Sequence, residues 1–295
     1  MTGFCIIDKP EGLSSFQVSR ALRRIFNEKK TGHIGTLDPM ATGVLPVAVG
    51  GATRFIPYIP DEDKEYIARF RLGIRTDTLD ITGKVTDTSP VTATADEVEK
   101  ILERFRGRIS QVPPMYSALS KDGVKLYKLA RQGIETEREA REISVYSLEL
   151  TNVLDYNEYE IKVSCSKGTY IRSLIDDIGT ALGTHAVMTY LRRTASNGFS
   201  IDEAVPLDAL SEMPFDAAAK TLISIDAAMS SYPEITVTEA QAKRFLNGGA
   251  LSIDRLKNIK TDGLFRVYSP DRRFLGLGEA GAELLNPKRV INADE

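Results

Sequence analysis

Two stretches of the chain combine a capping box with a helical stripe of apolar residues. In the first, Ser14 stands three positions before Gln17, and Val18, Leu22 and Ile25 follow at helical spacing. This pattern predicts an amphipathic helix whose outer face carries arginines. The second stretch repeats the same order of signals, with Thr94 and Glu97 as the box, Val98, Ile101, Leu102 and Phe105 as the stripe, and Gly107 as the stop.

Alternation of apolar and polar residues predicts a strand in "YIARFRLG". Tyr66, Ala68, Phe70 and Leu72 fall on one face, and an isoleucine and two arginines fall on the other. Tyr66 therefore stands at the end of an apolar face. A core tyrosine with its hydroxyl at the sheet edge explains this position, and so does an active-site ring.

Residues 159–183 form the clearest local unit. An alternating strand ends at Cys165, "SKGT" turns the chain, and an apolar stripe from Ile171 predicts a helix that stops at Gly183. Arg172 lies off this stripe, in the first turn of the helix. A cation is unfavourable there because the helix N-terminus is already positive. Arg172 is therefore either a solvated surface residue or the partner of a specific anion.

The character of the sequence changes near Pro233. Thr238 and Gln241 open a short predicted helix with its own capping box, and "LFRVYSPDRRFLGLGEA" predicts two strands around a Pro-Asp turn. The last 60 or so residues are therefore expected to form a small α+β module. The stretch "SEMPFDAAAK", near residue 215, has no clear period and is expected to form a loop.

Charge is unevenly distributed along the 295 residues, whose net charge is −3. Residues 1–60 carry seven Lys and Arg against four Asp and Glu, and residues 101–135 carry seven against three. These segments fit a nucleic-acid-binding face and fit ordinary basic helix surfaces equally well. The length suggests roughly two domains.

Signals for cofactors, metals and membranes are missing from the sequence. The only histidines are His33 and His185, no cluster has metal-ligand spacing, and neither GxGxxG nor GxxxxGK[ST] occurs. There is no apolar run of about 18 residues and no basic start of a signal peptide. We expect a cytoplasmic protein without metal or cofactor, in which Cys5 and Cys165 are buried free thiols.

The stretch "GTLDPMATGVLP", residues 35–46, contains a single ionisable side chain, Asp38. Because Pro39 disfavours the helical region for the residue before it, Asp38 can simply tighten a turn. The alternative is a carboxylate held in a poorly solvated pocket for chemistry.

Four segments together closely resemble the bacterial tRNA pseudouridine synthases of the TruB family. They are "GHIGTLDPMATGVLPVAVGGATRF" (32–55), "KEYIARFRLGIRTDTLDITG" (64–83), "QVPPMYSALSKDGVKLYKLARQG" (111–133) and "SKGTYIRSLIDDIG" (166–179). The resemblance runs from "GFCIIDKPEGLSS" to "NPKRVI", and the C-terminal module is similar to a PUA domain.

An α+β fold is what this resemblance implies. We expect a catalytic domain over residues 1–232, with a mixed, mostly antiparallel central sheet and flanking helices. Residues 233–295 would form a PUA-like RNA-binding domain.

The implied activity is the isomerisation of uridine 55 in the T loop of tRNA to pseudouridine, by a monomer that needs no metal or cofactor. Asp38 matches the family's catalytic nucleophile, which attacks either the sugar or the base. Burial would raise the pKa of this carboxyl, and Arg172 matches the arginine that would hold it charged. Tyr66 matches the tyrosine that stacks on the uracil and helps to remove the C5 proton.

Four more residues match positions at which the family binds its substrate. Such positions are needed because the target base must be flipped out of its loop. His33 would enter the vacated region of the T loop, and Asp80 would help to hold the flipped nucleotides. Tyr170 and Leu191 would line the uracil pocket. A lone histidine is otherwise often structural, and Asp77 and Asp80 can both be turn residues.

Two other functional classes stay open at this point. A non-catalytic RNA-binding or chaperone protein could share the fold, although a pure binder needs no buried nucleophile. A hydrolase could pair Asp38 with Asp77 or Asp80, and such an enzyme should act without RNA.

Overall fold

The computed structural model describes residues 1–60, 63–256 and 262–291. Ten of its strands form one large sheet: β1 (Gly3–Lys9), β2 (Thr31–His33), β3 (Thr42–Val49), β4 (Lys64–Leu72), β7 (Gly107–Gln111), β10 (Arg141–Val153), β11 (Glu158–Cys165), β12 (Ala186–Ser196), β13 (Phe199–Ser200) and β14 (Val205–Pro206). Their order is β14-β1-β3-β12-β4-β11-β10-β7, with β2 beside β3 and β13 beside β12. Only the β1–β14 and β12–β3 pairs are parallel among these strands. The predicted mixed, mostly antiparallel sheet is therefore confirmed.

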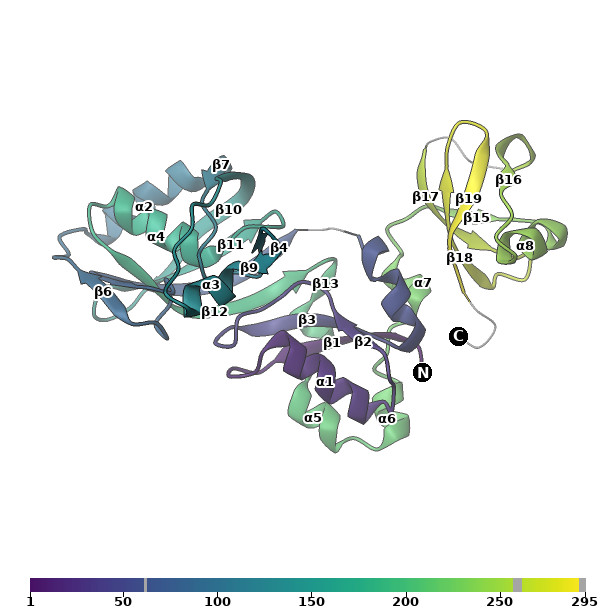
Figure 1. Cartoon of the computed structure of the whole chain (residues 1–295), viewed down its shortest axis with the longest axis horizontal. Coiled ribbons are helices and arrows are strands. Elements are labelled where there is room, and N and C mark those ends of the chain that lie inside the picture. Colours follow the sequence, from purple (N-terminus) through teal and green to yellow (C-terminus); the bar gives the residue numbers. More distant parts are fainter. Residues whose placement is uncertain (61–62, 257–261, 292–295) are drawn as a thin grey trace.

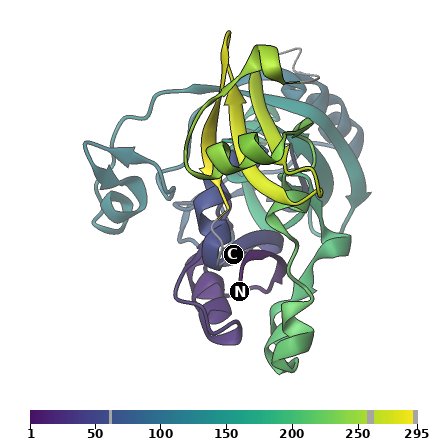
Figure 2. The same ribbon diagram turned by 90° about the vertical axis from the view of Figure 1, so that its right-hand side faces the viewer.

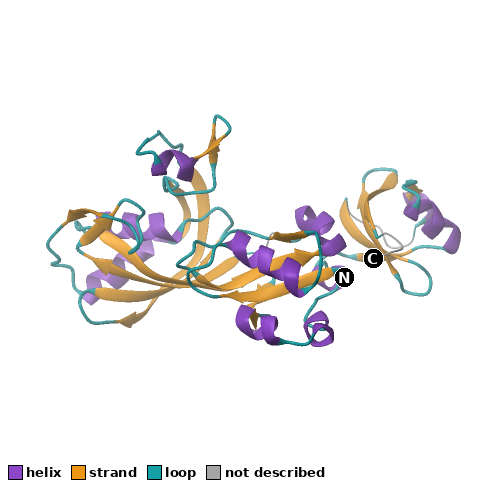
Figure 3. Ribbon diagram, turned by 60° about the horizontal axis from the view of Figure 1, so that its bottom comes forward, coloured by secondary structure: helices purple, strands orange, loops and turns teal. Residues whose placement is uncertain are grey.

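Helices pack along this sheet on both of its faces (Figures 1 and 3). The helices of the described chain are α1 (Ser15–Ile25), α2 (Ala95–Leu102), α3 (Leu126–Arg131), α4 (Ile171–Ala181), α5 (Leu207–Glu212), α6 (Phe215–Ala219), α7 (Ile225–Ala228) and α8 (Glu239–Leu246), with the 3-10 turns η1 (Gly50–Tyr58), η2 (Glu103–Phe105), η3 (Ile201–Glu203) and η4 (Ile253–Arg255). The main hydrophobic cluster joins one face of the sheet to α1, α2, α4 and α5. A second cluster joins the other face of β1 and β3 to η1 and α7.

The predicted local signals form as expected. Ser14, Thr94 and Thr238 each accept a hydrogen bond from the third helical residue and complete a capping box. In β4, the buried positions alternate with partly exposed ones, beginning at Tyr66. Strand β11 ends at Cys165 and is followed by α4, and both cysteines are free and buried.

Two details differ from the sequence-based expectation. The stretch predicted to be a loop, residues 211–220, contains all of α6 and the last two residues of α5, and Ala218 of α6 joins the main cluster. Helix α5 has 6 residues and α6 has 5, so each is too short to establish a visible period. The helix predicted up to Gly107 ends at Leu102 and continues only as the 3-10 turn η2.

The C-terminal module is a separate PUA-like sheet set at one end of the molecule (Figure 1). Its strands are β15 (Glu234–Thr236), β16 (Leu251–Ser252), β17 (Gly263–Tyr268), β18 (Phe274–Ala280) and β19 (Leu284–Val290), in the order β15-β17-β18-β19-β16. The predicted pair around the Pro-Asp turn is confirmed as β17 and β18. Leu277 of this module is buried in the second hydrophobic cluster, the one that contains residues of β1 and β3. Arg266 of the module also pairs with Asp226 of α7 at 3.0 Å. Residues 257–261 and 292–295 of the expected module lie outside the described residues.

Two small hairpins complete the fold. One consists of β5 (Ile74–Thr76) and β6 (Val85–Thr88), and the other of β8 (Ser120–Lys121) and β9 (Val124–Lys125), followed by α3. The segment with β8, β9 and α3 extends away from the large sheet (Figure 2). In the part of the chain described here, no helix is long and apolar enough to cross a membrane.

Candidate active site

The loop between β2 and β3 presents Asp38 at a fixed position. Hydrogen bonds hold the residue on each side of it: the Ser15 hydroxyl donates to the Leu37 carbonyl and accepts its N–H, and the Gly12 N–H donates to the Pro39 carbonyl at 2.7 Å. The Asp38 carbonyl accepts a turn hydrogen bond, as the Asp-Pro pair predicts. Its side chain, which is 36% exposed, stays available for other contacts.

Arg172 reaches this carboxylate from α4, and its Nη2 lies 2.9 Å from Asp38 Oδ2. The arginine is 5% exposed. Nη1 also donates to the Thr78 carbonyl and Nη2 to the Tyr116 carbonyl, both at 2.9 Å. Arg172 is therefore a buried side chain that joins four chain segments rather than a solvated surface arginine. The ion pair with Asp38 offsets its unfavourable place in the first helical turn.

Burial raises the pKa of Asp38 above its ordinary value, and the charge of Arg172 is the main opposing influence. Asp80 adds to the rise, and Lys9 opposes it. The sequence-based expectation that a guanidinium would favour the charged form is correct in direction. The pairing with Arg172 limits the rise of the Asp38 pKa but does not cancel it, so the pKa stays above its ordinary value.

Asp80 lies on the other side of Arg172, with Oδ2 3.9 Å from Nη1. Its Oδ1 accepts hydrogen bonds from the Thr78 hydroxyl and from the N–H and hydroxyl of Thr82. Asp77 faces elsewhere: it accepts the Lys84 N–H at 2.8 Å and the Tyr116 hydroxyl at 3.4 Å. Arg172 thus stands between Asp38 and Asp80, and neither carboxylate has the surroundings of a proton-sharing pair.

Of the remaining predicted residues, Tyr66 and Tyr170 lie close enough to Asp38 for its charge to affect their pKa values. Tyr66, on β4, is 6% exposed, and Leu191, on β12, belongs to the same hydrophobic cluster. Tyr170 precedes α4, where Gln111 holds its backbone by two hydrogen bonds. Burial raises the pKa of Tyr170, and among the groups acting on it are Arg172 and Asp38. His33 ends β2, and its Nδ1 lies 3.1 Å from the Ser19 hydroxyl.

Sequence reasoning did not single out two buried cations near Asp38. The Lys9 Nζ donates to three backbone carbonyls, those of Pro10, Leu13 and Pro39. Burial lowers the pKa of Lys9 to about 8. The second cation is Arg193, which is 1% exposed. Each stands at a strand position where the alternation of apolar and polar residues would place a buried apolar side chain. A charged residue at such a position is the signal that could have identified them.

Gly43, on β3, allows the close approach of β3 to Arg193. Its φ is +100°, and a Cβ there would lie 2.1 Å from the Arg193 carbonyl oxygen. We expect Gly43→Ala to reduce the free energy of unfolding by at least about 3 kcal/mol, from backbone strain and overlap together. Gly183, which has a φ of +73° and open space around it, provides the control. Gly183→Ala should cost only about 1–2 kcal/mol in the same urea titration, and equal losses would contradict the steric explanation.

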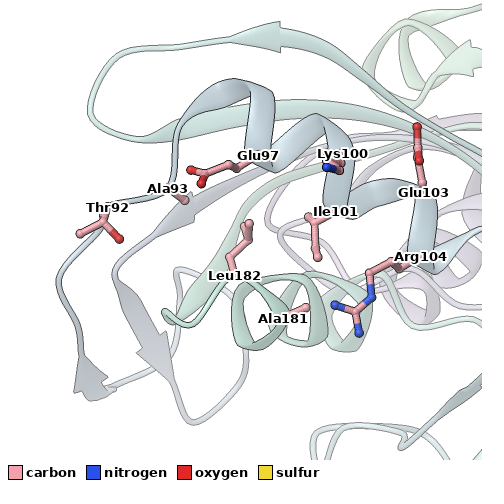
Figure 4. A pocket seen from close by; sticks show the side chains of 9 residues that line it. All are labelled: Thr92, Ala93, Glu97, Lys100, Ile101, Glu103, Arg104, Ala181 and Leu182. Atoms are coloured by element: carbon pink, nitrogen blue, oxygen red, sulfur yellow. The ribbon is translucent and has the colours of Figure 1, made fainter.

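A pocket of about 630 Å³ lies between α2 and the end of α4 (Figure 4). Its lining includes Glu97, Lys100, Ile101, Arg104 and Leu182. None of the predicted site residues lines it, so it is not the Asp38 site. In the described residues, no three His, Cys, Asp or Glu side chains are grouped so that they could hold a metal ion.

Comparison with known families gives the loop and the ion pair their context. The N-terminal domain profile of the TruB family pseudouridylate synthases matches residues 23–171. Two C-terminal profiles of the same family match residues 172–230 and 233–291. This chain belongs to the TruB family. It is therefore an enzyme that isomerises uridine, and the resemblance found in its motifs is confirmed.

Curated relatives and solved structures agree with this family assignment. A protein of Aromatoleum aromaticum named tRNA pseudouridine synthase B is 45% identical over 291 residues, with 98% of this chain and 92% of that protein covered. The protein of that name from Syntrophomonas wolfei is 43% identical, with both chains covered completely. A solved chain of a Cbf5-Nop10-Gar1 complex superposes with a TM-score of 0.75 at 26% identity, covering 98% of this chain and 84% of that one. The TruB fold assignment therefore extends over nearly the whole chain.

Proposed function

We propose that this enzyme converts uridine 55 in the T loop of tRNA to pseudouridine, with Asp38 as the nucleophile that acts on the flipped-out uridine. The contact between Asp38 and Arg172 is the observation that carries the proposal, because it places a carboxylate and its cation in one partly open site. The names of the curated relatives support tRNA as the substrate.

The reaction requires an ionised nucleophile, and the site is arranged to provide one. The N1–C1′ bond breaks, the uracil turns, and C5 bonds to C1′. Arg172 favours the carboxylate form of Asp38 and fixes its orientation, and Asp80 in turn holds the guanidinium from behind. We therefore propose that Asp80 acts on the reaction through Arg172, in addition to any contact with the flipped nucleotides.

The other predicted residues are proposed to receive the flipped nucleotide. Tyr66 would stack on the uracil and accept its C5 proton, while Leu191 and Tyr170 would line the pocket. Burial lowers the pKa of His33, with Arg193 adding to the effect. A neutral imidazole is suited to stacking and hydrogen bonding in the vacated loop.

RNA binding beyond the target loop is proposed to use the basic segments 1–60 and 101–135 and the C-terminal module. Phosphate contacts supply most of the affinity in such interfaces and make it dependent on salt. We further propose that the enzyme acts as a cytoplasmic monomer.

Mapping pseudouridine in a T stem-loop RNA tests the proposal directly. After incubation with the purified full-length chain, we expect one new pseudouridine, at position 55. An otherwise identical RNA with cytidine at this position should stay unmodified. Modification at other uridines would contradict the assigned position, whereas binding without modification would favour an RNA chaperone.

A further inference from the structure

Arg193 occupies the centre of the sheet directly beside Tyr66. In the β4–β12 ladder the two residues are register partners, and Arg193 is also the partner of Gly43 on β3. Directly opposed residues of an antiparallel pair point to the same face. The guanidinium reaches the loop that carries Asp38. Gly35 belongs to this loop, and a Cβ at Gly35 would lie 3.4 Å from the Arg193 Nη1.

This guanidinium lacks the partners that a buried cation normally has. Its Nε donates to the Val44 carbonyl at 2.8 Å, whereas its Nη2 is buried without any hydrogen-bond partner. No ion pair joins Arg193 to a carboxylate within the described ranges of the chain. A buried and unpaired charge costs several kcal/mol, so its presence calls for a compensating role.

Arg193 has a second buried cation near it, Lys9, and no carboxylate of its own among the described residues. Its charge contributes to lowering the pKa of both Lys9 and His33, after the larger effect of burial. The carboxylate of Asp38 is already occupied by Arg172. The free protein therefore holds a positive site without a matching anion at this point of the sheet.

Tyr66 can supply that anion during the reaction. Burial raises the pKa of its phenol, and the charge of Arg193 is the main influence that opposes this rise. The other groups acting on Tyr66 are Cys165 on β11 and Asp38, which both favour the neutral phenol. Arg193 is thus the group that favours the phenolate form of Tyr66.

We infer that Arg193 positions the Tyr66 hydroxyl and stabilises it as the phenolate that takes the C5 proton in the final step. The inference rests on the proposed function. Once C5 is bonded to C1′, its C5–H bond breaks and the proton moves to the Tyr66 oxygen. The electron pair restores the C5=C6 bond, and the C6=N1 pair moves to N1, which takes up a proton. Before this step the neutral Tyr66 phenol has released its own proton to solvent. The C5 proton therefore restores the phenol, the proton taken up by N1 comes from solvent, and the isomerisation leaves no net charge.

The test compares Arg193→Met and Arg193→Lys with a control, Arg192→Met. Arg192 lies on the opposite face of β12 and pairs with Asp8 at 2.7 Å. Each variant is assayed on T stem-loop RNA with hydrogen or deuterium at C5 of the target uridine. For Arg193→Met we expect kcat to fall by about 100-fold, a typical value for lost proton-transfer catalysis, with KM nearly unchanged. A primary isotope effect should emerge, and the rate should rise only at higher pH than in the wild type.

Arg193→Lys keeps the positive charge and should recover part of kcat. This recovery would show that Arg193→Met loses activity through the missing charge and not through a loss of folding. Arg192→Met should match the wild type. A fall in kcat without an isotope effect or pH shift would overturn the inference, and so would a raised KM with unchanged kcat. If the wild type formed no pseudouridine at all, the proposed function itself would be wrong.

Discussion

Asp38→Asn is expected to abolish pseudouridine formation in T stem-loop RNA while the affinity for tRNA stays within about tenfold. Asn keeps the shape of the side chain but cannot act as an anionic nucleophile. Binding should survive because phosphate contacts dominate such interfaces. Pseudouridine mapping and a filter-binding titration on the same preparation measure the two effects.

The same variant should keep or increase its free energy of unfolding at pH 7. The pKa of Asp38 is raised in the folded protein, so the native state binds this proton more tightly than the unfolded state does. Ionisation of Asp38 above its unfolded pKa therefore costs stability, and Asn removes that cost.

Asp77→Asn is the matched control, since its amide oxygen can still accept the Lys84 N–H. This variant should stay active. If Asp38→Asn still formed pseudouridine, Asp38 would not be the nucleophile. If Asp77→Asn were inactive, the result would favour the alternative enzyme that pairs Asp38 with Asp77.

Arg172→Gln is expected to lower kcat by about 100-fold or more, as for other losses of a preorganised charged partner. It should also move the acidic limb of the pH–rate profile to higher pH. The active form is the carboxylate, so activity is lost as pH falls through the folded pKa of Asp38. The charge of Arg172 is the largest influence that lowers the pKa of Asp38 against the effect of burial. Without the guanidinium, that pKa therefore rises further.

Two companion variants make this result specific. Arg172→Lys retains the charge but not the two-nitrogen geometry, so its acidic limb should lie between those of the wild type and Arg172→Gln. Arg192→Gln removes an arginine that pairs with Asp8 instead of Asp38, and it should leave the acidic limb of the pH–rate profile in place. An unchanged limb in Arg172→Gln would show that another group keeps Asp38 ionised.

Local signals in the sequence predicted much of the fold. The capping boxes at Ser14, Thr94 and Thr238 fix helix starts within a few residues, and alternation in β4 identifies its buried face. Helices α5 and α6 were missed because they depend on packing against the main cluster rather than on a period of their own.

The site was predictable only where a residue violates a local rule. Arg172 was noticeable because a helix N-terminus disfavours a cation, and motif similarity joined it to Asp38. The positions of Lys9 and Arg193 depend on the order of strands in the sheet. Pairings such as β3 with β12 join residues about 150 positions apart, so no local pattern places these side chains beside Tyr66 and Asp38.

The central claim is that Arg172 holds Asp38 in its carboxylate form, and a direct titration of Asp38 tests it. The chain is labelled with ¹³C at aspartate carboxyls, and the Asp38 signal is identified by its absence from Asp38→Asn. We predict a pKa above the ordinary aspartate value in the wild type and a still higher one in Arg172→Gln. The same pKa in both proteins would contradict the account.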